Sequence, residues 1–93
     1  MAKNIYQLDR VRIYLSEIQK AIDFMMNDDW FLANLTLKSL RVSCLSEINN
    51  NVSLSQEYLR FLKKMYQLLE NDEDLLEHLI KIRSLCHAFI KNK

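Results

Sequence analysis

The sequence contains neither glycine nor proline among its 93 residues. Those two residues make most of the tight turns that connect β-strands, and glycine also builds the loops that hold nucleotide phosphates. Their absence disfavours a β-rich fold and excludes every glycine-dependent nucleotide-binding motif. The composition therefore indicates an all-α protein, and the length indicates a single helical-bundle domain spanning residues 1–93.

The sequence also lacks an excess of either positive or negative charge, because 13 basic and 12 acidic residues leave a net charge of +1. Nucleic-acid binding draws most of its affinity from a basic surface, and Lys63-Lys64 is too small a cluster to supply one. No apolar run approaches the ~20 residues of a membrane span, and the N-terminus has no apolar signal segment. We therefore expect a cytoplasmic protein that binds neither nucleic acid nor a membrane.

Only two cysteines are present, Cys44 and Cys86, and both fall within apolar helical patterns. A small secreted domain usually carries a larger set of paired cysteines. We therefore expect two buried free thiols in a reducing compartment. A single disulfide that joins two helices is the alternative.

Apolar residues at steps of three and four predict a first helix over about residues 3–26. The predicted stripe consists of Ile5, Leu8, Val11, Leu15, Ile18, Ile22 and Met25. Asp28 or Asp29 is suited to cap a second helix, at whose start Trp30 is expected to cover one end of the bundle. The second helix ends at Asn49-Asn50-Asn51 and is apolar over a wide arc, so we expect it to be the most buried element.

Ser53 and Gln56 form a capping-box pattern that predicts the start of a third helix. Its apolar spacing continues from Tyr58 to Phe89, and only Asp72 interrupts it. We therefore predict an antiparallel bundle of three helices with a long third helix, over about residues 54–90. A helix of that length would project beyond its partners and expose apolar side chains. Since Asn71 and the acids after it also resemble a helix start, four helices with a break near Asn71 is the alternative.

Candidate catalytic and metal-binding sets are weak. Arg83 and His87 lie one turn apart, but a catalytic base needs a positioned partner, and the pattern supplies none. Cys86, His87 and His78 lack the spacing of zinc ligands, because adjacent helical residues point about 100° apart. We expect a protein that is not an enzyme and that uses no metal or other cofactor.

The segment from Leu68 to Arg83 resembles the corresponding helix of the FliT-type flagellar export chaperones. Members of that family carry an aliphatic pair, an Asn/Asp-Glu step, and a second aliphatic pair shortly before an arginine. The similar positions here are Leu68-Leu69, Asp72-Glu73, Leu79-Ile80 and Arg83. Trp30, which follows an acidic turn, is also similar to the start of the family's second helix.

The resemblance implies a cytoplasmic chaperone that keeps the filament-cap protein competent for export by binding an amphipathic helix of this client. Such chaperones also contact the export ATPase. The implied partner surface consists of Leu75, Leu76, Leu79, Ile82 and Arg83. We expect it to extend along the same stripe to Cys86 and Phe89, which gives seven predicted partner-binding residues. The family commonly has a further C-terminal helix that regulates partner access, and this sequence stops at Lys93 without one. The family also has leucine roughly where His87 stands.

Other functions stay open at the level of the sequence. A small phage- or plasmid-encoded inhibitor or immunity protein is often a compact helical bundle that covers the surface of its partner. Homodimerisation through the projecting helix would bury the same apolar side chains. A helical nuclease built around Arg83 and His87 is the least favoured hypothesis.

Overall fold

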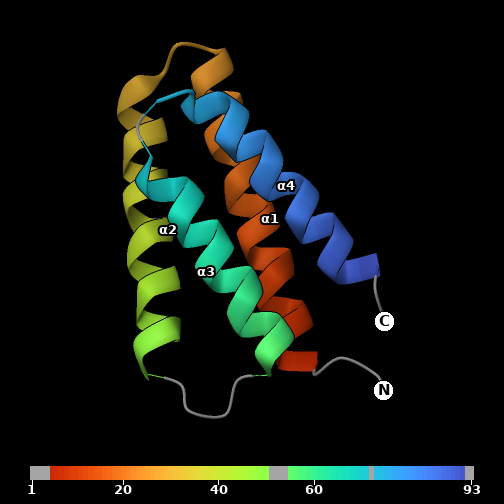
Figure 1. Cartoon of the computed structure of the whole chain (residues 1–93). Helices are drawn as coiled ribbons and strands as arrows, with labels where there is room; N and C mark the ends of the chain where they lie inside the picture. The colour runs from red at the N-terminus through yellow and green to blue at the C-terminus, as the bar shows by residue number, and fades with distance from the viewer. Residues whose placement is uncertain (1–4, 51–54, 72, 92–93) are drawn as a thin grey trace.

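The computed structural model describes residues 5–50, 55–71 and 73–91, which form four α-helices and no strand. α1 spans Ile5–Met26, α2 spans Trp30–Asn50, α3 spans Gln56–Glu70 and α4 spans Leu75–Lys91. Consecutive helices run in opposite directions (Figure 1). α1 packs against α2 and α4, and α3 packs against the same two helices. In cross-section the four helices therefore stand at the corners of a square. The prediction of an all-α antiparallel bundle is confirmed.

The predicted long third helix is not continuous, so the prediction of three helices is wrong. α3 ends at Glu70, Asn71 has extended backbone with φ −86° and ψ 113°, and the chain then turns back into α4. The Asn71 side chain accepts a hydrogen bond from the Glu73 N–H at 3.0 Å, which is the geometry of an Asx turn. Asp74 follows in the left-handed conformation with φ 52°. The alternative of four helices with a break near Asn71 is confirmed.

The apolar spacing continues across this break because α3 and α4 bury their stripes in the same core. The buried residues of these two helices are Tyr58, Phe61, Leu62, Met65, Leu69, Leu79, Ile82, Cys86 and Phe89. A straight helix would leave one of the two stripes without neighbours, whereas a chain that folds back covers both from water. Preserved phase therefore does not distinguish one long helix from a helical hairpin.

Aspartate and serine residues shape the beginnings and ends of the helices, where glycine and proline are often found. Asp28, two residues after the end of α1, takes a left-handed conformation with φ 59°. Asp29 caps α2, because its side chain accepts from the backbone N–H three residues further on at 3.2 Å, as predicted. Ser55 caps α3 in the same way at 3.2 Å. The predicted capping residue Ser53 lies outside the described residues.

The buried face of α1 is rotated slightly from the predicted stripe. Val11, Ile18, Ile22 and Met25 are buried as predicted, whereas Tyr14 and Ala21 also enter the core. Leu8 and Leu15 lie at the edge of the core and are half-buried, and Ile5 is 76% exposed. The buried face of α1 is therefore centred on the side that faces its neighbours α2 and α4, and not on the apolar stripe predicted from the sequence.

The prediction that the second helix is the most buried element is wrong. On α2 only Ala33, Leu37, Leu40 and Cys44 are buried. The large apolar side chains that stay exposed on it are Trp30, Phe31, Leu32, Leu35, Val42 and Leu45. Its wide apolar arc reaches from the core to solvent, because α1 and α3 cover only the inner half of the helix. The arc therefore marks an uncovered face rather than deep burial.

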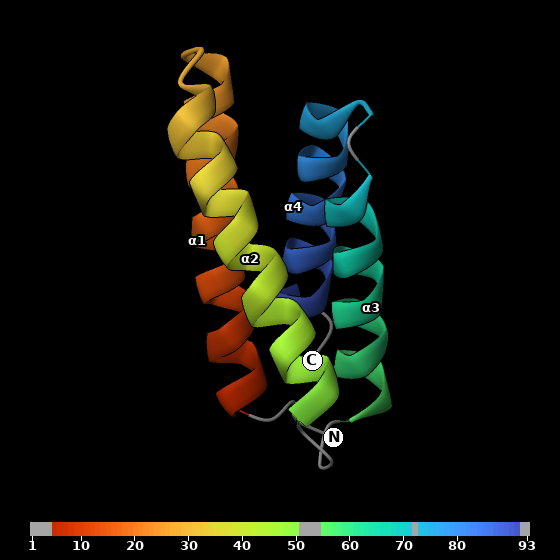
Figure 2. The same cartoon turned by 90° about the vertical axis from the view of Figure 1, so that its left-hand side faces the viewer.

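The projecting element is the α1–α2 hairpin rather than the third helix. α1 and α2 contain 22 and 21 residues, against 15 in α3 and 17 in α4. At 1.5 Å per residue, the first hairpin is longer than the second by roughly 8 Å. Figure 2 shows its closed end standing beyond the start of α4. Within the described ranges, none of the helices has the length and apolarity needed to cross a membrane.

Candidate functional site

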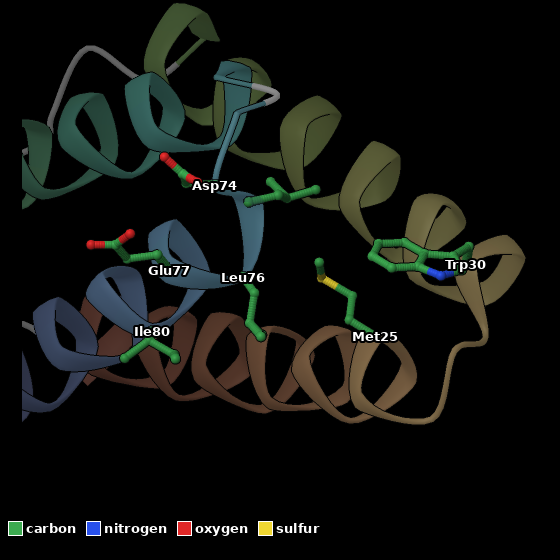
Figure 3. Close-up of a pocket in the computed structure, with 7 residues that line it drawn as sticks. Met25, Trp30, Asp74, Leu76, Glu77 and Ile80 are labelled. Carbon is green, nitrogen blue, oxygen red and sulfur yellow. The ribbon is translucent and has the colours of Figure 1, made fainter.

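An open cleft of about 570 Å³ lies where the projecting end of the α1–α2 hairpin meets the first turns of α4. Figure 3 shows Trp30 at one end of this cleft and Glu77 toward the other, with Met25 and Leu76 between them. The cleft forms because α4 begins below the closed end of the hairpin, so that end has none of the described helices opposite it. The lining residues are Met25, Trp30, Asp74, Leu75, Leu76, Glu77 and Ile80.

The apolar part of this lining can be reached from solvent. Trp30 is 51% exposed and Ile80 is 41% exposed, while Leu75 and Leu76 are half-buried. Met25 is buried and supplies the floor. Exposed apolar surface that gathers on a small protein and is bordered by polar groups is typical of a protein-binding site.

Three of the seven predicted partner-binding residues are accessible in the folded bundle. Leu75 and Leu76 line the cleft. Arg83 is half-buried, and its Nη1 donates a hydrogen bond to Gln19 Oε1 at 3.1 Å, which links α4 to α1. Contact of these three residues with a partner stays a prediction.

The other four predicted residues lie in the core, so the folded bundle does not present them to a partner. Leu79, Ile82 and Cys86 are completely buried. Phe89 packs against the rings of Tyr58 and Phe61, with centroid distances of 5.8 and 5.4 Å. The physical reason is that α4 has helices on two sides, so its most regular apolar stripe turns inward.

Sequence reasoning did not assign Met25, Trp30 and Ile80 to a common site. Ile80 lies next to the regular stripe of α4, and the spacing therefore places it toward solvent. Trp30 does lie at one end of the bundle as expected, but it forms one wall of an open cleft rather than a cover. A tryptophan directly after a helix cap is the signal that could have found the site, because a ring of this size at a helix end is rarely enclosed on both faces.

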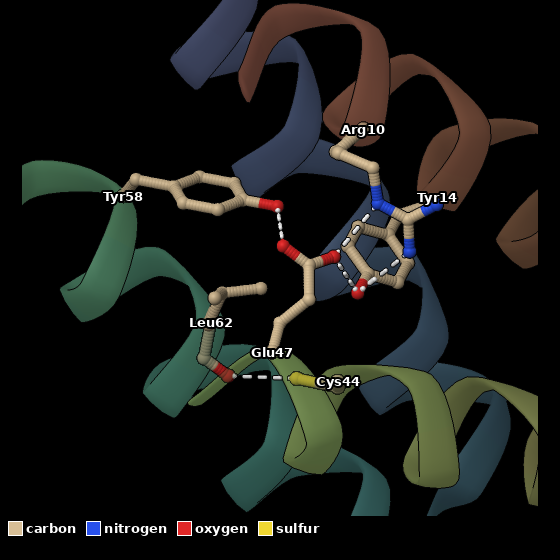
Figure 4. Close-up of polar contacts among 6 residues, drawn as sticks. All are labelled: Arg10, Tyr14, Cys44, Glu47, Tyr58 and Leu62. Carbon is tan, nitrogen blue, oxygen red and sulfur yellow. Dashed lines mark hydrogen bonds and ion pairs between the residues drawn. The ribbon is translucent and has the colours of Figure 1, made fainter. Parts of the chain in front are cut away.

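A buried polar network joins α1, α2 and α3 around the Glu47 carboxylate (Figure 4). Arg10 Nε donates to Glu47 Oε1 at 2.7 Å, and the Tyr14 hydroxyl donates to the same oxygen at 2.5 Å. The Tyr58 hydroxyl donates to Oε2 at 2.6 Å. Arg10 Nη2 also donates to the Tyr14 oxygen at 3.2 Å, and the guanidinium carbon lies 4.9 Å from the centre of that ring.

The electrostatics of this network favour the ionised arginine and the neutral tyrosines. Burial raises the pKa of Tyr14 and Tyr58, and their hydrogen bonds to Glu47 raise it further. Burial alone would lower the pKa of Arg10, but its hydrogen bonds to Tyr14 and Glu47 outweigh burial and raise it. Since three donors surround the carboxylate, the network stabilises the contact of three helices and leaves Glu47 poorly placed to act on a substrate.

Both cysteines are free and buried, as expected. The Cys44 thiol donates to the Leu62 carbonyl oxygen at 3.2 Å. Burial raises the pKa of Cys44 and of Cys86 to about 12, so neither thiol is an activated nucleophile at neutral pH. Among the described residues, no three His, Cys, Asp or Glu side chains gather in a group that could hold a metal ion.

No protein-family model matches the chain, and no curated protein or solved structure matches it either. The cleft at the start of α4 is apolar with one acidic end, and such a site is suited to hold side chains of another protein.

Proposed function

We propose that the protein binds a helical segment of another protein in the cleft between the α1–α2 hairpin and α4. We further propose that it does so as a cytoplasmic chaperone of a flagellar or type III export client, with the filament-cap protein as the first candidate. The observation that carries the proposal is the exposed apolar lining of the cleft, to which three helices contribute.

The cleft offers enough apolar surface for a reversible complex. A tryptophan side chain buries 150–250 Å² when fully covered, so covering the exposed half of Trp30 removes about 100 Å² from water. At about 25 cal/mol per Å², that area contributes roughly 2.5 kcal/mol. Covering Ile80 and Leu76 adds to this contribution, whereas ordering a flexible client segment opposes it. The balance favours a weak and reversible complex, which suits a chaperone that must release its client.

A helix is the form of client that the lining favours. Leu76 and Ile80 are one turn apart on α4, so they present a row of apolar side chains parallel to the helix axis. An amphipathic helix with apolar residues at steps of three and four fits beside such a row. The exposed carboxylates of Asp74 and Glu77 favour a lysine or arginine of the client at that end of the cleft.

The similarity to the FliT-type chaperones suggests the identity of the client. Leu75 and Leu76 belong to the family-like segment and are also cleft residues, so the resemblance and the geometry coincide on the first turn of α4. The export ATPase is a second possible partner under the same resemblance. Leu79, Ile82, Cys86 and Phe89 take no part in the proposed contact because they form the core.

Titration calorimetry against the C-terminal segment of a filament-cap protein from the same source tests the proposal. Ile80→Asp is the cleft variant, and Ile13→Asp is the matched control, since Ile13 is 50% exposed on α1 and lies outside the cleft. We expect saturable binding that Ile80→Asp weakens at least tenfold and that Ile13→Asp leaves unchanged, with the helicity of both variants retained.

Absence of any complex at high micromolar concentration would overturn the export-chaperone proposal. The inhibitor or immunity hypothesis would then become the leading one, and the neighbouring genes would discriminate further. A toxin or phage operon supports the inhibitor, whereas flagellar cap and filament genes support the chaperone.

A further inference from the structure

The outer face of α2 carries a row of apolar side chains that none of the other described helices covers. It lies opposite the buried row of the same helix, because a helix turns 100° per residue and the two rows are about half a turn apart. Phe31 is 73% exposed and Val42 is 62% exposed, whereas Cys44 and Leu37 on the inner face are buried. We call this row the outer stripe, and it consists of Phe31, Leu35, Val42 and Leu45, with Lys38 at its centre.

The spacing of the outer stripe is that of a coiled-coil seam. From Phe31 the positions follow at steps of four, three, four and three, through Leu35, Lys38 and Val42 to Leu45. This alternation is the heptad pattern that lets one helix pack along another over several turns. The stripe covers 14 residue steps and is therefore about 21 Å long, which is the length of four turns of a partner helix.

The charge of the outer stripe is positive and is not neutralised on α2. Lys38 is exposed in the middle of the apolar row. The single acidic residue of α2 is Glu47, and its carboxylate points inward to Arg10, Tyr14 and Tyr58 (Figure 4). A helix that covers the stripe therefore meets one cation, which an opposing carboxylate would satisfy.

A second copy of this chain fits that charge poorly. Lys38 lies at the centre of the stripe, so two stripes packed face to face bring their Lys38 side chains within about one turn of each other. This holds for parallel and for antiparallel helices in register. With no acid on the outer face of α2, the two ammonium groups repel each other in the middle of the interface.

We infer that the outer stripe of α2 docks an amphipathic helix of a partner protein that carries a glutamate or aspartate opposite Lys38. This surface is separate from the cleft, because none of Phe31, Leu35, Val42 and Leu45 lines the cleft. The protein therefore has two docking surfaces of opposite charge preference. The cleft favours a basic segment, and the outer stripe favours an acidic one.

Two synthetic helical peptides test the inference. Each has leucine at the seam positions of three heptads except the central one, which is glutamate in the first peptide and lysine in the second. Binding of fluorescently labelled peptide is measured for the wild-type protein and for Val42→Asp, Lys38→Glu and Ile13→Asp. All substituted side chains are exposed, and circular dichroism verifies that the variants keep their helicity.

We expect the glutamate peptide to bind wild-type protein at least tenfold more tightly than the lysine peptide. Val42→Asp should weaken this binding at least tenfold, Ile13→Asp should leave it unchanged, and Lys38→Glu should reverse the preference between the peptides. Equal affinity for both peptides, or no effect of Val42→Asp, would overturn the inference.

Sedimentation equilibrium of the wild-type protein decides between a foreign helix and a second copy. The inference requires a monomer at micromolar concentration. A dimer that dissociates in the Val42→Asp variant would instead assign the outer stripe to self-association and overturn the inference. Because the peptides address α2 and the client segment addresses the cleft, failure of this experiment leaves the proposed chaperone function untouched.

Discussion

The Tyr58 hydroxyl donates to Glu47 Oε2 across 2.6 Å, while the other oxygen of the same carboxylate accepts from Arg10 Nε at 2.7 Å. One side chain of α2 is thus bonded to α3 through the first contact and to α1 through the second. Since Tyr58 is completely buried and the Glu47 side chain is only 11% exposed, water cannot replace the Tyr58 hydroxyl without opening the bundle, whereas the Arg10 side chain stays 25% exposed at the edge of the network. Glu47 therefore fixes the relative register of three helices.

Replacing this carboxylate should destabilise the fold. Glu47→Gln keeps the shape of the side chain but removes the charge that pairs with Arg10, and its amide N–H group faces another donor. We expect a loss of about 2–3 kcal/mol, seen as a fall in Tm of roughly 10 °C. The double variant with Tyr14→Phe should lose less than the sum of the two single variants, because both remove the same hydrogen bond. Strict additivity would show that Tyr14 and Glu47 are not coupled.

Stability should fall at alkaline pH because of the two buried tyrosines. The pKa of Tyr14 and of Tyr58 is raised in the folded state, whereas an unfolded chain loses tyrosine protons near pH 10. The stabilising contribution is complete below about pH 10 and is lost as the pH rises toward the folded-state pKa, because the unfolded state releases its protons first. Each tyrosine contributes a slope of up to about 1.4 kcal/mol per pH unit.

Denaturant unfolding at pH values between 9 and 12, roughly spanning the tyrosine titration, measures this slope. We expect Tyr58→Phe to be less stable than wild type at neutral pH but to lose stability less steeply above pH 10. An identical slope in wild type and variant would contradict the assignment of alkaline destabilisation to Tyr58.

The two thiols should be protected from alkylation and disulfide exchange in the folded protein. Burial raises the pKa of Cys44 and Cys86 to about 12, so little thiolate exists at pH 8 and reagents cannot reach it. A thiol-specific disulfide reagent should react slowly in buffer, at a rate set by opening of the bundle, and should react at once in concentrated guanidinium chloride. Rapid release of one equivalent of chromophore from the native protein would contradict the burial of one cysteine.

Adjacent residues of α4 should differ sharply in their tolerance of substitution. Leu79 is completely buried, so Leu79→Ala leaves a cavity and should cost about 2–5 kcal/mol. Ile80 is 41% exposed, and Ile80→Ala should cost less than about 1 kcal/mol while weakening client binding. A larger loss of stability from Ile80→Ala than from Leu79→Ala would show that Ile80, and not Leu79, faces the core.

The left-handed residue between α1 and α2 gives a test of backbone conformation. Asp28 has φ 59°, which a β-branched residue tolerates poorly, so Asp28→Val should destabilise the protein by about 1–2 kcal/mol. Asp28→Gly removes the same charge without this steric cost and should lie within about 1 kcal/mol of wild type. Equal destabilisation by both substitutions would point to the lost carboxylate instead of the backbone as the cause.

Much of the architecture follows from local patterns in the sequence. The absence of glycine and proline and the three/four spacing predict helices, and Asp29 ends the first loop as a capping residue should. The sequence could not show whether the helix breaks at Asn71, because the helical spacing between Leu69 and Leu79 is compatible with a straight helix and with a hairpin. What decides it is the free energy of covering both stripes at once, and that depends on helices far away in the sequence.

The candidate site was only partly predictable for a related reason. Leu75 and Leu76 were identified, but their apolar neighbours Leu79 and Ile82 follow the same pattern and lie in the core. Periodicity shows which residues share a face of a helix, and it does not show whether a second helix covers that face. Trp30 and Ile80 line one cleft only because the two hairpins differ in length, which is a relationship between elements and not a property of either one.

The packing of α1 against α4 has a consequence for how the chain acquires its structure during synthesis. The other packed pairs join helices that are consecutive in the sequence, whereas the hydrogen bond from Arg83 to Gln19 spans 64 positions. Local hairpins form early because little chain entropy is lost in closing them, and the pairing of the first and last helices closes the bundle afterwards. Until α4 leaves the ribosome, α1 has an open apolar flank, so the newly made chain depends on the synthesis of α4 for protection from aggregation.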